Sequence, residues 1–167
     1  MSISDIATMI MALATTGSVL YIARQVRVTR QQAKGQFLLA LDERLENFRG
    51  TTIQLMNNPD YVPDQWVEVW RLMSVFERIN IMVEDQILDI PLVDRLYGYL
   101  LIMIVGNDAV YQRVKTSGSE WQDFIDLCYA IADERRKHAC SDIEKAFIER
   151  VNTLDKGLHP TANPFIP

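Results

Sequence analysis

The chain has 167 residues and a formal net charge of −5, which suits one domain plus an anchoring segment. The charge is uneven: residues 1–34 carry four basic side chains and one acidic side chain, a net +3, and the rest carries −8. An acidic body disfavours general nucleic-acid binding, which needs basic surface to neutralise phosphates. Two cysteines and two histidines give no zinc-ligand spacing, so neither a metal nor a cofactor is expected.

The N-terminal part contains an uncharged apolar run, residues 6–23, followed by Arg24, Arg27, Arg30 and Lys34. Eighteen residues is near the lower limit for a membrane-spanning helix. The acidic start at residues 1–5 is the wrong charge order for a cleaved signal peptide. A core or interface helix is the remaining alternative, because threonine and serine make the run moderately apolar. A transmembrane anchor over residues 1–23 accounts for both the length and the flanking charges.

The basic residues after the run predict the orientation. By the positive-inside rule, the N-terminus is expected to lie outside the membrane and the body to be cytoplasmic. Arg24, Arg27 and Arg30 recur every three residues and, with Lys34, are expected to contact anionic lipid head groups. A solvated basic turn without lipid preference is the alternative.

The anchor has a face of small residues. At about 100° per residue, five side chains fall within one third of the helix surface: Ala7, Thr8, Ala14, Thr15 and Ser18. Small residues let membrane helices approach closely, so this face predicts self-association or, in a ring of copies, a pore lumen. A weakly hydrophobic anchor with scattered small residues is the alternative.

Residues 24–57 contain no proline and favour helix, which predicts that the anchor continues as a stalk to about Met56. Four apolar residues follow the 3-4-3 spacing of a coiled-coil seam: Leu38, Leu41, Leu45 and Phe48. A seam this short more often packs against its own domain than in a free coiled coil.

Residues 58–157 predict a helical bundle of about four further helices. The first spans 65–85, and the second begins at Pro91 behind a possible Asp89 cap. The apolar run 96–105 of that second helix is short for a membrane span and is expected to be buried. A third helix starts near Ser119, and Ser141 opens the last with a capping box. The tail, residues 158–167, is expected to be irregular, so the fold class is all-α.

The sequence lacks familiar catalytic motifs. No arginine stands four to six intervening residues before either histidine, the Arg-x4–6-His spacing of one type of ribonuclease. No nucleotide-binding loop, nucleophile elbow or zinc-protease motif occurs either. The densest acidic group is expected to be a solvated rim rather than a metal site: Glu77, Glu84, Asp85, Asp89 and Asp94. The run Arg135-Arg136-Lys137-His138 either complements a helix dipole or binds an anionic partner. Cys128 and Cys140 are expected to be reduced thiols, at least one of them in the core.

Several segments together resemble a bacterial family of single-span, all-helical proteins catalogued as domain of unknown function 4760: Gln25-Val26-Arg27, Phe37-Leu38-Leu39, Val75-Phe76-Glu77-Arg78-Ile79-Asn80 and Leu96-Tyr97-Gly98. The resemblance covers roughly residues 6–135, lies in order and spacing, and implies the single-span helical architecture without an activity. A looser, architectural likeness links the chain to membrane-anchored accessory proteins of type VI CRISPR systems.

These patterns predict a non-enzymatic, membrane-anchored helical protein that self-associates and acts as a scaffold, sensor or regulatory partner at the inner leaflet. Its partners would be the lipid membrane, further copies of the chain and another protein bound through the helical body. The alternative is an oligomeric pore or membrane-perturbing effector in antiphage defence.

Overall fold

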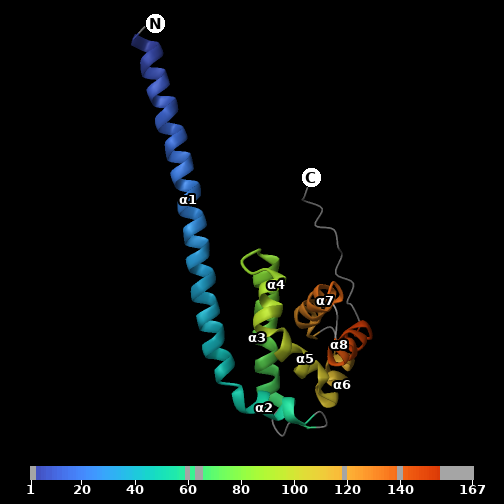
Figure 1. The fold of residues 1–167 in the computed structure, drawn as a ribbon. Coiled ribbons are helices and arrows are strands. Elements are labelled where there is room, and N and C mark those ends of the chain that lie inside the picture. The colour runs from blue at the N-terminus through green and yellow to red at the C-terminus, as the bar shows by residue number, and fades with distance from the viewer. Residues whose placement is uncertain (1–2, 59–60, 63–65, 118–119, 139–140, 155–167) are drawn as a thin grey trace. The chain divides into compact units, whose positions relative to one another are not determined.

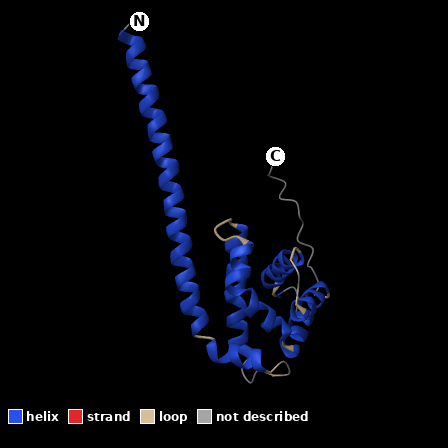
Figure 2. Cartoon of the chain, in the orientation of Figure 1, coloured by secondary structure: helices blue, strands red, loops and turns tan. Residues whose placement is uncertain are grey.

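The structure, a computed structural model, describes residues 3–58, 61–62, 66–117, 120–138 and 141–154, with backbone alone for residues 3–10 and 12–14. Every regular element in these ranges is helical (Figures 1 and 2). This confirms the all-α prediction. The chain divides into two compact units, Met1–Ala40 and Leu41–Pro167.

In the first unit the described residues, 3–40, belong to one helix, α1 (Ile3–Glu46), whose last residues, 41–46, belong to the second unit. Its apolar side chains are largely exposed, among them Met11, Val19, Leu20, Tyr21 and Ile22. Among the helices whose side chains are described, no single one is both long and apolar enough to cross a membrane. Most of the predicted anchor side chains before Thr15 lie outside that description.

The predicted stalk is interrupted. Helix α1 ends at Glu46, and α2 (Arg49–Asn57) begins after Phe48, whereas the sequence predicts one helix to about Met56. Asn47 and Gly50 are weak helix formers, and tertiary contacts made by α2 stabilise the break between the two helices. Leu55 becomes fully buried, and the Thr51 hydroxyl donates a 2.5 Å hydrogen bond to Glu68.

The core of the second unit is centred on α3 (Trp66–Glu84) and α7 (Gln122–Arg136), which pack together. Phe76 and Phe124 meet edge to face, with ring centroids 6.2 Å apart, and neither is exposed. The sequence-predicted helix over 65–85 is confirmed as α3. The predicted start of the third helix at Ser119 lies outside the described residues.

The apolar run 96–105 lies in the π-helical turn η1 (Asp94–Gly98) and in α5 (Tyr99–Gly106), which follow directly on α4 (Ile90–Val93). Asp89 caps α4 by accepting a 3.0 Å hydrogen bond from the Leu92 amide, and Pro91 lies in the first turn, as predicted. Residues 90–106 and α6 (Asp108–Thr116) form a helix pair bent by 85° that is together long and apolar enough for a broken membrane span. Leu101, Ile102, Ile104 and Val105 are nevertheless buried, as expected of a core helix.

The bend before α6 is made by Asn107, which is fully buried. Its side-chain oxygen accepts a 3.0 Å hydrogen bond from the Val110 amide and so caps α6. Its amide nitrogen donates to the Asn58 and Tyr61 carbonyl oxygens at 3.2 and 3.0 Å. One side chain therefore starts α6 and ties it to the segment that follows α2.

The last described helix, α8 (Asp142–Asn152), begins with the predicted capping box between Ser141 and Glu144. It packs against α5 and α7. Arg150 donates to the Val105 carbonyl oxygen at 3.2 Å and pairs with Asp108 at 2.6 Å. Both bonds hold α8 to the junction of α5 and α6. The predicted irregular tail, 158–167, lies outside the described residues.

Candidate functional site

The predicted membrane-surface residues all lie on α1 in the first unit. Arg24, Arg27 and Arg30 are exposed, and Lys34 is half-buried. Of the predicted small-residue face, Thr15 and Ser18 are exposed, while the side chains of Ala7, Thr8 and Ala14 lie outside the described residues. The Thr15 hydroxyl donates a 2.8 Å hydrogen bond to the Met11 carbonyl oxygen. This satisfies a polar group that would otherwise be costly on an apolar helix.

The predicted stalk seam does not remain on one helix. Leu41 is buried within the second unit, and Leu45 and Leu38 are half-buried on α1. Phe48 falls outside α1, at the start of α2. For Leu41, burial within its own unit agrees with packing against the domain rather than in a free coiled coil.

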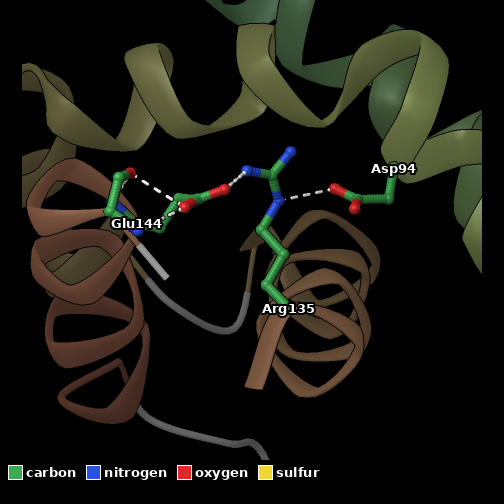
Figure 3. Close-up of polar contacts among 4 residues, drawn as sticks. Asp94, Arg135 and Glu144 are labelled. Carbon is green, nitrogen blue, oxygen red and sulfur yellow. Dashed lines mark hydrogen bonds and ion pairs between the residues drawn. The ribbon is translucent and has the colours of Figure 1, made fainter. Parts of the chain in front are cut away.

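A cluster of charged groups joins η1, α7 and α8. The Arg135 guanidinium lies between two carboxylates, pairing with Asp94 at 2.7 Å and with Glu144 (Figure 3). All three side chains are at most one quarter exposed. Because a charge-assisted pair with planar geometry restricts orientation, Arg135 fixes how these three elements meet.

The π-helical turn provides the space for this cluster. A Cβ atom on Gly98 would lie 2.1 Å from the Asp94 carboxylate and 2.9 Å from the Arg135 guanidinium. Any other residue at this position would therefore displace the ion pair. Such turns are rare and recur at functional sites. Here the charged groups beside the turn, Asp94, Arg135 and Glu144, pair with one another, so the turn contributes to packing.

Glu144 belongs to the same cluster and also to the capping box. Hydrogen bonds from the Ser141 amide and hydroxyl, together with the charge of Arg135, hold the pKa of the Glu144 carboxyl below its ordinary value. The amide bond is 2.6 Å and the hydroxyl bond is 2.8 Å. The ionised form of Glu144 is therefore the one that stabilises the fold.

The predicted basic run at the end of α7 is engaged within the protein. Besides Arg135, Arg136 pairs with Asp133, and Lys137 pairs with Glu134 at 2.5 Å. Their partners are on the same helix, and Arg136 also reaches Asn152 of α8 at 2.5 Å. These contacts favour a structural role for the run over recruitment of an anionic ligand.

The predicted acidic group is dispersed. Asp89 caps α4, Asp94 pairs with Arg135, and Glu84 accepts a 3.0 Å hydrogen bond from Asn80. Within the described ranges, no three histidine, cysteine or acidic residues come together as a metal site. These carboxylates therefore serve separate structural purposes.

Two further titratable groups are held in protonated forms. Cys128 is fully buried, and burial raises the pKa of its thiol well above the ordinary value. Burial also raises the pKa of Tyr97, whose hydroxyl donates a 2.7 Å hydrogen bond to Asp42. A protonated thiol is a poor nucleophile, and the tyrosine bond ties the end of α1 to η1.

A surface groove of about 460 Å³ is the candidate functional site, and we name it the arginine groove. It lies between the end of α1, the α1–α2 turn and the outer face of α3. Three guanidinium groups and three large apolar side chains are its main lining: Arg44, Arg71, Arg78, Phe48, Val67 and Trp70. The sequence analysis did not identify it. The available signal was the pair Arg71 and Arg78, which are seven residues apart and hence on one helix face.

Comparison with protein-family models, with curated proteins and with solved structures finds no match for this chain. The resemblance to the family of domain of unknown function 4760 therefore stays a prediction, as does the looser likeness to accessory proteins of CRISPR systems.

Proposed function

We propose that this protein is a non-enzymatic, membrane-anchored binding module that self-associates and acts as a scaffold, sensor or regulatory partner at the inner leaflet of a bacterial membrane. One observation carries the proposal. Val19, Leu20, Tyr21 and Ile22 of α1 are consecutive apolar residues, each 58–67% exposed.

Consecutive residues on a helix point about 100° apart, so these four side chains cover every side of α1. A helix that packs against one partner needs a single apolar face, whereas a helix apolar all round suits lipid or a fully enclosing assembly. Burying each large apolar side chain is worth about 1.5–3 kcal/mol. Leaving this part of α1 in water would therefore forfeit several kcal/mol.

Length and charge support the same assignment. The uncharged run 6–23 would extend about 27 Å as a helix, close to the roughly 30 Å hydrocarbon layer. Arg24, Arg27, Arg30 and Lys34 then fall at the head-group level on the cytoplasmic side. Basic residues beside a span add about 1 kcal/mol each to binding of anionic lipid.

Self-association would use the small-residue face of the anchor, which permits close helix approach. Ala14 and Ser18 form its small-xxx-small pair. In this proposal the helical body presents a binding surface, and the anchor sets its location and copy number.

Alkaline carbonate extraction of the full chain tests the anchor. We expect the wild type to stay in the membrane pellet and Leu13→Arg, near the middle of the run, to shift into the supernatant, because arginine at a helix centre costs about 2.5–3.5 kcal/mol. Leu39→Arg is the matched control, since Leu39 is exposed outside the run. Extraction of the wild type, or of Leu39→Arg alone, would contradict the proposal.

Native mass measurement in nanodiscs then tests self-association. We expect a defined oligomer that Ala14→Leu or Ser18→Leu reduces to smaller species, while a monomer at all protein densities would contradict it. If the protein caused dye leakage from vesicles and Thr15→Leu abolished that leakage, the result would favour the pore function over the scaffold function.

A further inference from the structure

The arginine groove differs from the rest of the helical body in its charge. The body is strongly acidic, and most arginines elsewhere in it are neutralised. Within the described residues, carboxylates pair with Arg49, Arg135, Arg136 and Arg150. No carboxylate in the same ranges pairs with Arg44, Arg71 or Arg78. The fold thus gathers three unneutralised guanidinium groups around one groove.

The groove also exposes large apolar surface. Val67 is 48% exposed and Trp70 is 37% exposed, and both project from α3 into the lining. The opposite face of the same helix supplies the buried core residues Leu72, Phe76 and Ile79. Four exposed side chains follow this outer face of α3 at helical spacing: Val67, Trp70, Arg71 and Arg78.

Trp70 is held in place from outside the groove lining. The Arg113 guanidinium of α6 lies 5.6 Å from the Trp70 ring centroid and 5.2 Å from that of Trp66. Such cation–π contacts restrain a tryptophan that is partly in water. A restrained aromatic wall lowers the entropy lost when a ligand binds.

We propose that the arginine groove binds an acidic segment of a partner protein, with one apolar side chain of that segment seated against Trp70 and Val67. Guanidinium groups bind carboxylates in a bidentate geometry. Tryptophan and arginine dominate the binding energy of protein interfaces. The net negative charge of the surrounding body repels an extended polyanion such as nucleic acid more strongly than a short acidic segment that contacts the groove alone.

This inference rests on the proposed role as a binding module and names the chemistry of its partner. It does not depend on membrane insertion or on the number of copies, because the groove lies wholly within the second unit.

The test is a selection with a phage-displayed library of random twelve-residue peptides against the full chain in nanodiscs. We expect enriched peptides to carry aspartate or glutamate beside an aromatic or aliphatic residue. A labelled enriched peptide should bind Arg71→Glu/Arg78→Glu at least about tenfold more weakly, the loss of one or more charge-assisted hydrogen bonds. A version with lysine in place of its acidic residues should not bind.

The charge-matched control is Arg95→Glu/Lys115→Glu, which alters two exposed cations outside the groove and should bind within about twofold of the wild type. The groove variant should keep the wild-type circular dichroism and subunit number. Enrichment without acidic residues, or equal binding by both variants, would overturn the inference. A subunit number changed by Arg71→Glu/Arg78→Glu would also overturn it, because the occupant would then be a second copy. Failure in carbonate extraction would instead concern the anchor alone.

Discussion

Gly98 leaves open the volume that the Asp94 carboxylate occupies, since a Cβ atom at Gly98 would lie 2.1 Å from Asp94 Oδ1. Asp94 and Gly98 are four residues apart in one π-helical turn. The Asp94 carboxylate, which lies in the space beside Gly98, is the group that pairs with Arg135. The absence of a side chain at Gly98 therefore allows the ion pair that joins η1 to α7.

Replacing Gly98 by alanine tests this relationship. Alanine should gain up to about 1 kcal/mol in helix propensity, but displacing Asp94 from a largely buried pair should cost more. We expect a net loss of about 1–2 kcal/mol in the free energy of unfolding. Urea unfolding of the full chain can be followed by tryptophan fluorescence, because all three tryptophans lie in the second unit: Trp66, Trp70 and Trp121.

Gly50→Ala is the matched control, because nothing lies within 4 Å of a Cβ atom there. It should stabilise the protein by about 0.5–1 kcal/mol. Equal stability of Gly98→Ala and Gly50→Ala would show that the Asp94 pair contributes nothing.

Asn107 should be the most costly polar residue to truncate. Asn107→Ala removes the cap of α6 and leaves the Asn58 and Tyr61 carbonyl oxygens without their side-chain donor. A lost cap costs about 1 kcal/mol and unsatisfied partly buried groups about 1–3 kcal/mol. We expect urea unfolding to show a combined loss of about 2–4 kcal/mol.

Asn107→Ser separates the two contributions, since serine caps a helix but cannot reach both carbonyl oxygens. Its loss should lie between those of wild type and Asn107→Ala. If serine were as costly as alanine, the cap would not contribute.

The sequence predicted those parts of the fold that are encoded locally. The capping box at Ser141, the Asp89 cap and the helix that became α3 all follow from residues within one or two helical turns of each other. The apolar run 96–105 was also predicted to be buried, because its length suits a core helix better than a membrane span. Six of its ten residues are buried, whereas Leu96 and Tyr99 are exposed.

The rest depends on residues far apart in the sequence. Asn107 follows the apolar run 96–105 in the sequence, yet its role requires carbonyl groups 46 and 49 residues away. The break at residues 47–48 depends on burial of Leu55 and on the Thr51–Glu68 bond. The arginine groove likewise joins residues of α1 and α3, so helical periodicity within α3 could not identify it.

The capping box gives a pH dependence. The pKa of Glu144 is lowered in the folded state, so its contribution is complete above the ordinary carboxyl pKa and is lost as pH falls through the folded pKa. We expect the urea midpoint to fall between about pH 5 and pH 3, and Glu144→Gln to reduce that fall. At pH 7 the variant should be less stable by about 1 kcal/mol. An unchanged slope in Glu144→Gln would assign the acid sensitivity to other carboxylates.

Glu77 should behave in the opposite sense. Burial raises the pKa of its carboxyl, reinforced by the charge of Asp123 and opposed by a hydrogen bond with Ser74. Between the ordinary and the raised pKa, the folded state retains a proton that the unfolded chain has released, so stability decreases as pH rises through that window. Glu77→Gln removes this cost and should raise the free energy of unfolding at pH 7 by less than about 1 kcal/mol, because the residue is half-buried. Glu149→Gln makes the same charge change at an exposed position of α8 and should leave stability within about 0.5 kcal/mol of wild type. Urea unfolding at pH 4 and pH 7 tests this prediction. The stability that Glu77→Gln gains over the wild type should be smaller at pH 4 than at pH 7. An equal gain at the two pH values would mean that the carboxyl charge is not its cause.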